Sequence, residues 1–183
     1  MIADLAMHIA DLVENALRAR AREVRVVVRR SGEHLYLEVA DDGGGMDPHT
    51  LQRACDPFFS TKPGAKVGLG LPLLKQTAEA LGGTCGLESS PGLGTRVWVN
   101  LPWGHPDRPP LGDLVGTLVP LVVTSPGVEF TVELGDDQST WILSTRELRE
   151  HVGDVPLSHP EVLSFLEGEM ARTAEALGLK ESA

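Results

Sequence analysis

The sequence is poor in cysteine and in aromatic residues. It has two cysteines, Cys55 and Cys85, without C-x-x-C spacing or a histidine–cysteine cluster, which argues against a zinc site and against a disulfide framework. Aromatic residues make up 4% of the chain, so we expect a core of mainly leucine, valine, alanine and isoleucine. The longest apolar runs, such as LVPLVV, are too short to span a bilayer. Since the N-terminus also lacks a signal-peptide pattern, we expect a cytoplasmic protein with no membrane partner.

Positive charge is also scarce. The chain has 16 lysine and arginine residues against 26 aspartate and glutamate residues, giving a net charge of -10 and a sequence pI near 5.0. Binding along a nucleic-acid backbone needs a surplus of lysine and arginine, so no nucleic-acid partner is expected. The local basic run at 18–30 is interpreted as the solvated ends of a helix and a strand. At 183 residues with 42% apolar residues, the chain suits one domain, or one domain with a sizeable appendage.

The first hundred residues predict an α+β fold. Residues 4–19 have a helical period with an apolar arc, and the alternating runs that follow are typical of strands. We predict a two-layer α/β sandwich, in which helices cover one face of a mostly antiparallel mixed sheet. The expected elements are a helix at 4–19, a hairpin at 23–30 and 34–40, a short helix at 48–55 opened by Asp47 and Pro48, a helix at about 71–81, and strands at 84–90 and 95–102.

The rest of the chain divides into a connector rich in proline and glycine at 103–112 and a C-terminal α+β appendage at 113–183. The run LGDLVGTLVPLVV fits either a short helix broken at Pro120 or a buried strand, and VEFTVEL with STWIL predicts a hairpin. Two capping boxes follow, Ser144 with Glu147 and Ser158 with Glu161, and the second opens a final amphipathic helix. We identify no catalytic constellation in this segment.

Four short motifs follow one another in the first unit, 1–102. They are DLVENA at 11–16, DDGGGM at 41–46, FFSTK at 58–62 and KVGLGL at 66–71, and GTRVWV begins the last strand at 94–99. Glycine before a helix leaves backbone N–H groups free to face an anion, which favours phosphate at Gly68 and Gly70. Taken alone, DDGGGM also fits a plain turn.

In this order the motifs resemble the boxes of the ATP-binding domain shared by DNA gyrase, Hsp90-type chaperones, histidine kinases and MutL, the GHKL or Bergerat fold. DLVENALRARA resembles the N-box, DDGGGM the D-x-G-x-G box, FFSTK the F-box and GLGL the second glycine box. The resemblance covers residues 1 to about 102. It implies a histidine-kinase-like domain that binds ATP and Mg²⁺.

The resemblance also implies roles for single residues. Asp41 accepts a hydrogen bond from the adenine amino group, Thr95 supports the adenine, and Asn15 offers Mg²⁺ its amide oxygen. Asp42 is interpreted as exposed and incidental. Lys62 is either a contact to the terminal phosphate or an ordinary exposed lysine. The nucleotide-binding residues implied by the motifs are Asn15, Asp41, Gly43, Gly45, Met46, Thr61, Lys62, Gly68, Leu69, Gly70, Leu71 and Thr95.

Asp11 stands four residues before Asn15, at the position where hydrolysing members of the family have a catalytic Glu. Most histidine kinases have Asn or His there. Two roles stay open for this shorter carboxylate: a general base acting on water or on a protein hydroxyl, or a group that only holds Mg²⁺-bound water. His8 lies on the same predicted helix and is interpreted as a polar neighbour of the site.

Three functions fit these features. We expect a stand-alone signalling kinase without a phospho-accepting histidine module, which passes phosphate from ATP to a separate protein partner. The alternatives are a slow ATPase that switches shape and a non-enzymatic nucleotide sensor. The whole chain also resembles stand-alone ATP-binding proteins encoded beside iron-only hydrogenase subunits, which implies a partner in such a system.

Overall fold

The computed structural model describes residues 4–56 and 70–180. Up to residue 102, helices and strands follow one another in the predicted order. The elements are α1 (Leu5–Arg18), β1 (Glu23–Ser31), β2 (His34–Asp41), α2 (Pro48–Arg53), α3 (Gly70–Ala80), β3 (Thr84–Ser90), β4 (Gly94–Pro102), α4 (Leu114–Val123), β5 (Glu129–Gly135), β6 (Thr140–Ser144), α5 (Thr145–Val152) and α6 (Pro160–Ala176).

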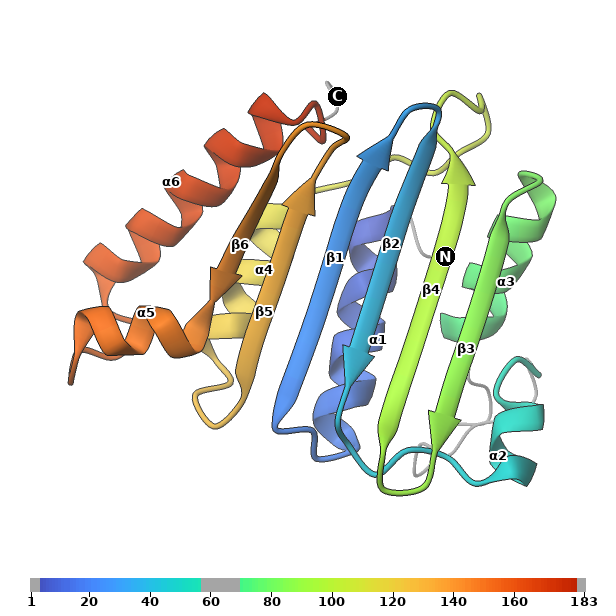
Figure 1. Ribbon diagram of the computed structural model, residues 1–183, viewed down its shortest axis with the longest axis horizontal. Helices are drawn as coiled ribbons and strands as arrows, with labels where there is room; N and C mark the ends of the chain where they lie inside the picture. The colour runs from blue at the N-terminus through green and yellow to red at the C-terminus, as the bar shows by residue number, and fades with distance from the viewer. Residues whose placement is uncertain (1–3, 57–69, 181–183) are drawn as a thin grey trace.

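The strands form one six-stranded sheet in the order β3-β4-β2-β1-β5-β6. All neighbouring strands are antiparallel except β1 and β5, which run parallel. In Figure 1, α1, α3 and α4 lie behind this sheet, and α6 packs beside α4. The predicted two-layer α+β sandwich with a mostly antiparallel mixed sheet is therefore confirmed.

The C-terminal strands extend the sheet of the first unit. Strand β5 pairs with β1 along its length, with Val24 opposite Phe130, and β6 then closes that edge as a hairpin with β5. The segment 113–183 thus has the expected mixture of helices and strands, but it shares a sheet and a hydrophobic core with residues 1–102. The segment boundaries at 102 and 112 stay a prediction.

The two faces of the sheet have different chemistry. Alternate residues such as Val24, Val26 and Val28 of β1 are buried towards the helices. On the opposite face the Glu38 side chain is only 4% exposed and forms an ion pair with Arg96 at 2.7 Å. The helix-facing side of the sheet is therefore the apolar one, and it positions the site described below.

Most of the predicted helix starts are confirmed. Asp47 caps α2 with Pro48 in its first turn, and Ser144 caps α5 by accepting a hydrogen bond from the Glu147 N–H. The run around Pro120 is a helix, α4, which settles the helix-or-strand alternative.

The Ser158 capping box is wrong, because His159 is the N-cap of α6. Pro160 takes the first helical position, where its missing N–H costs nothing, and this fixes the cap one residue after Ser158. No helix among the described residues is long and apolar enough to cross a membrane.

Candidate functional site

Two predicted residues, Asp41 and Thr95, meet a third polar residue, Ser89, at one end of the sheet. Asp41 is the last residue of β2, Thr95 of β4 lies directly opposite it, and Ser89 of β3 lies opposite Thr95. Val39 and Val97, two residues further into the strands, are buried in the core, so all three polar residues face the helix layer. The pairing register therefore brings together side chains that are far apart in the sequence.

Two of the three glycines of DDGGGM are required by the protein's own packing. A Cβ on Gly43 would lie 2.9 Å from the Ala19 carbonyl oxygen, and a Cβ on Gly45, whose φ is +64°, would overlap the Ser90 carbonyl oxygen. Gly44 has room, since its nearest contact would be 3.7 Å away. The loop is thus held between the end of α1 and the β3–β4 turn, which is also why it lies close to Asp41.

We expect Gly45→Ala to destabilise the protein and Gly44→Ala, the matched control, to have little effect. Alanine at position 45 would adopt a left-handed conformation and displace the Ser90 backbone, which together cost about 2–4 kcal/mol. Urea denaturation of both variants measures this difference in the free energy of unfolding. Equal losses in the two variants would contradict the packing argument.

Ser89 connects three neighbouring residues through its hydroxyl group, and the sequence motifs did not indicate it. Its hydroxyl accepts a hydrogen bond from the Met46 N–H at 2.8 Å, donates to the Gly94 carbonyl at 2.8 Å and lies 2.9 Å from the Thr95 hydroxyl. A serine hydroxyl has one donor and two acceptor positions, so Thr95 donates to Ser89 in this arrangement. These hydrogen bonds fix Thr95 and the end of the glycine loop relative to each other.

Asp41 is a partly desolvated carboxylate. Its Oδ1 accepts a hydrogen bond from the Gly43 N–H at 2.8 Å. Burial raises the pKa of Asp41, while hydrogen bonds from the backbone of Gly43 and Thr95 oppose the rise and the neighbouring Asp42 adds to it. A carboxylate with few water partners is a strong acceptor for a donor N–H group on a ligand.

Asp42 is exposed, as predicted, but it is not incidental. Its Oδ1 accepts hydrogen bonds from the backbone N–H groups of Arg22 at 2.7 Å and Glu23 at 2.8 Å. These bonds lower the pKa of Asp42 and hold the start of β1 against the end of β2. The two adjacent carboxylates therefore have different partners: Asp42 binds the backbone at the start of β1, and Asp41 binds the glycine loop.

A second polar cluster lies on α1. The Asn15 side-chain amide donates to Asp11 Oδ2 at 3.3 Å, and its Oδ1 accepts from Arg18 at 2.5 Å. Asp11 also lies against the start of α3, because a Cβ on Gly70 would overlap Asp11 Oδ2. The structure thus brings the DLVENA motif and the second glycine motif into contact.

Arg18 is the residue of this cluster that the sequence prediction left out. It lies three residues after Asn15, and the same helical periodicity that groups Asp11 with Asn15 could have identified it.

Leu71 and Met46 complete the predicted residues that the structure describes. Leu71 is half-buried and packs against the core, and Met46 is also half-buried. Thr61, Lys62, Gly68 and Leu69 lie outside the described residues.

Residues 4–56 and 70–180 hold no group of three or more His, Cys, Asp or Glu side chains that could bind a metal ion by itself. A cation next to Asn15 would therefore take most of its oxygen ligands from a bound ligand and from water. That is the usual way in which Mg²⁺ accompanies phosphates, so the residues present fit this ion.

Comparison with known proteins agrees with this geometry. Residues 2–105 match the family described as histidine kinase-, DNA gyrase B-, and HSP90-like ATPase. The chain is 39% identical over 106 residues to the sensor histidine kinase DcuS of Escherichia coli K12, which covers 56% of this chain and 19% of that protein. It is 40% identical over 95 residues to the sensor histidine kinase ZraS of Klebsiella oxytoca, covering 50% of this chain and 20% of the relative.

A structural comparison supports the fold. The N-terminal domain of a DNA repair protein superposes with a TM-score of 0.53 at 16% identity, covering 78% of this chain and 53% of that one. At this identity the likeness concerns the fold alone. The chain spans about a fifth of the length of the two histidine kinases that it matches, 19% and 20%.

Proposed function

The chain belongs to the histidine kinase-, DNA gyrase B-, and HSP90-like ATPase family, and from this premise we propose that it binds MgATP at the site described above and acts as a kinase on a separate protein partner. Its ATP-binding domain is of the histidine-kinase-like type. The residue roles below, the metal and the partner are the proposed part.

The observation that carries this proposal is the meeting of Asp41, Thr95 and the glycine loop on the helix-facing side of the sheet. The adenine amino group donates a hydrogen bond to the free acceptor positions of Asp41. Thr95, held by Ser89, lies next to that carboxylate and completes the polar end of the base pocket. Gly43 and Gly45 keep the neighbouring backbone close and free of side chains.

The phosphates lie towards α1 and the start of α3 in this proposal. The N-terminus of α3 offers its free N–H groups and the positive end of its dipole to an anion. Asn15 would hold Mg²⁺ through its amide oxygen, and the ion would reduce the negative charge of the phosphates. Arg18 donates a hydrogen bond to Asn15 Oδ1. If the metal ion occupied that oxygen, the guanidinium of Arg18 would be able to contact the phosphates.

Asp11 is the residue proposed to act on the attacking group. Its carboxylate lies between Asn15 and Gly70, where the cation ligand and the phosphate-binding helix meet. As a general base it would take the proton from a protein hydroxyl or a water molecule while that oxygen bonds to the terminal phosphorus and the bond from this phosphorus to the oxygen of ADP breaks, so that ADP leaves. In the alternative role it only orients a water on the metal.

The names of the relatives favour the kinase over the alternatives. DcuS and ZraS are sensor histidine kinases, and residues 2–105, which match the family, contain the described residues of the site. A slow ATPase switch and a nucleotide sensor would use the same binding site and differ in turnover. A partner in an iron-only hydrogenase system stays a prediction, for which the comparisons offer no support.

The test is calorimetric titration of MgATP into wild type, Asp41→Asn and Asp154→Asn. The second variant is a matched control, because Asp154 is an exposed carboxylate in the turn after α5. We expect Asp41→Asn to weaken binding about 10- to 100-fold, since it loses a charge-assisted hydrogen bond of about 1.5–3 kcal/mol. Asp154→Asn should bind as wild type does. Absence of binding in wild type contradicts the proposed function, and full binding by Asp41→Asn contradicts the adenine position.

A further inference from the structure

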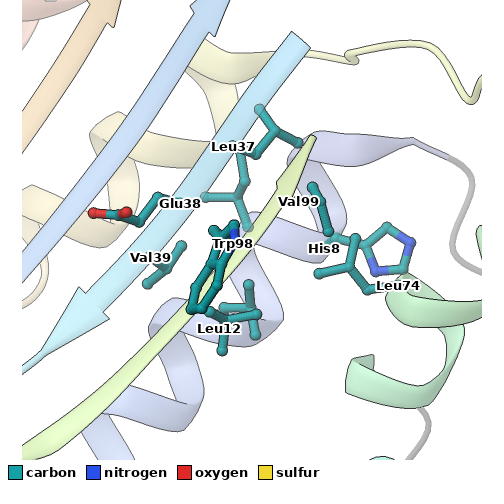
Figure 2. Close-up of a pocket in the computed structure, with 10 residues that line it drawn as sticks. His8, Leu12, Leu37, Glu38, Val39, Leu74, Trp98 and Val99 are labelled. Carbon is teal, nitrogen blue, oxygen red and sulfur yellow. The ribbon is translucent and has the colours of Figure 1, made fainter. Parts of the chain in front are cut away.

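His8 is a buried titratable side chain that has no part in the contacts proposed above. Only 5% of the residue is exposed, and it lines a cavity of about 10 Å³ between α1, α3 and the sheet. Figure 2 shows the imidazole beside Leu74 of α3. A cavity of this size is at the lower limit for one water molecule.

The surroundings of the imidazole are nearly all aliphatic. Strands β2 and β4 contribute Leu37, Val39, Val97 and Val99, and α3 contributes Leu74. Burying a polar ring in such walls is tolerable for the neutral form and costly for the cation.

Few charges face this ring from the packed elements. The carboxylate of Glu38 points away from the cavity in Figure 2 and is bound to Tyr36 and Arg96 on the other face of the sheet. Lys75 of α3 extends to Glu79, 3.8 Å away on its own helix. Burial lowers the pKa of His8, and the smaller opposing effect comes from Asp11 of α1 and from Asp4, the N-cap of that helix.

His8 and the proposed catalytic carboxylate belong to one seam between α1 and α3. Asp11 lies one helical turn after His8, and Leu74 lies one turn after Gly70. His8 packs beside Leu74 at one end of the seam, and Asp11 lies against Gly70 at the other. The two contacts are thus made by the same pair of helices, one turn apart on each helix.

We propose that His8 is a proton-sensitive positioning residue: protonation of its imidazole loosens the α1–α3 seam and weakens the binding of MgATP. The proposal rests on the proposed function, because it concerns the same site. Close packing between α1 and α3 favours the neutral form of His8, whereas looser packing lets water reach the protonated imidazole. The stabilising contribution is therefore complete above the ordinary histidine pKa of 6.5 and is lost as the pH falls below it.

The test compares MgATP affinity at pH 7.5 and 5.5 in wild type, His8→Leu and His8→Gln. The control is His34→Gln, which changes an exposed histidine at the start of β2. The terminal phosphate of the nucleotide also titrates in this range and affects all the proteins alike. The readout is therefore the difference between the proteins in how much MgATP affinity changes with pH. We expect the fall in MgATP affinity from pH 7.5 to pH 5.5 to be about fivefold larger in wild type and the control than in either His8 variant. A fivefold effect is at the lower end of the usual coupling between two sites. A parallel loss in all four proteins overturns the inference.

A second measurement covers the case in which both His8 variants fail to fold. Because coupling between two sites is reciprocal, bound MgATP should lower the pKa of His8 itself. NMR titration of the imidazole in wild type, with and without MgATP, measures this change. An unchanged pKa with and without MgATP overturns the inference. Absence of MgATP binding at pH 7.5 would instead contradict the proposed function.

Discussion

A fragment ending at Pro102 is expected to lose the cooperative fold of the protein, even though the family match ends only three residues later, at residue 105. The reason is the position of β1, which lies between β2 and β5 in the sheet. Removing residues 103–183 exposes Val24, Val26 and Val28 along a free strand edge. It also removes Phe130, Val132 and Leu134, which are all buried in the common core.

The N-box helix also depends on the later residues. The first-turn N–H groups of Leu5 and Ala6 donate to the carbonyl oxygens of Pro110 and Leu111, both at 2.9 Å. Helix α4 packs along α1 on the helix layer. Without these partners the helix that carries Asp11 and Asn15 loses both a terminal cap and one of its neighbours.

The expected loss exceeds the whole stability of an ordinary domain. Each of the three buried β5 side chains contributes about 1.5–3 kcal/mol, and the buried residues of α4 and α6 add to this, against a typical net stability of about 5–15 kcal/mol. Thermal unfolding followed by circular dichroism, with size-exclusion chromatography, measures the outcome. Coexpression of residues 103–183 as a separate chain is the control and should restore folding. A cooperative transition in the 1–102 fragment alone would contradict the argument.

Sequence reasoning predicted the parts of the fold that depend on local patterns. Periodicity and turn residues identified α1, the β1–β2 hairpin and the cap at Asp47, because each is encoded within a few consecutive residues. The pairing of Val24 with Phe130 was not predictable in this way. Parallel pairing joins segments that are far apart in the chain, and neither strand alone specifies its neighbour.

The same limit applies to the site. The motifs gave the order Asp11, Asn15, Asp41 and Thr95, and the structure places them in two clusters, one on α1 and one at the end of the sheet. Ser89 escaped notice because its role depends on the β3–β4 register. The structure adds a reason for Gly45 that the motif could not supply, because the Ser90 carbonyl oxygen, within the protein itself, leaves no room for a Cβ there.

Asp11→Asn is expected to reduce turnover of bound MgATP about 100-fold or more while changing its affinity less than about threefold. The variant keeps the size of the side chain and an oxygen that can accept the hydrogen bond from Asn15, so the geometry on α1 is preserved. It removes the only group there that is proposed to take a proton, and general-base catalysis contributes about 10²–10⁴-fold. Single-turnover release of phosphate and transfer of labelled phosphate to candidate partners measure the effect.

The matched control is Glu14→Gln, which neutralises an exposed carboxylate on the same helix that forms an ion pair with Arg18 at 3.5 Å. It should turn over MgATP at a rate within about twofold of wild type, because exposed ion pairs contribute little. Equal turnover in Asp11→Asn and wild type would remove Asp11 from the chemistry and leave it an orienting role. Tight binding without turnover in wild type would favour the nucleotide sensor.

Asp11→Glu tests why this position has the shorter carboxylate. Asp11 Oδ2 already fills the space where a Cβ on Gly70 would lie, so an added methylene has to displace α3 or turn away from it. We expect the longer carboxylate to lose affinity as well as turnover, because it moves the helix start that faces the phosphates. Full activity in Asp11→Glu would show that the seam adjusts freely, and it would separate the identity of the base from the packing between α1 and α3.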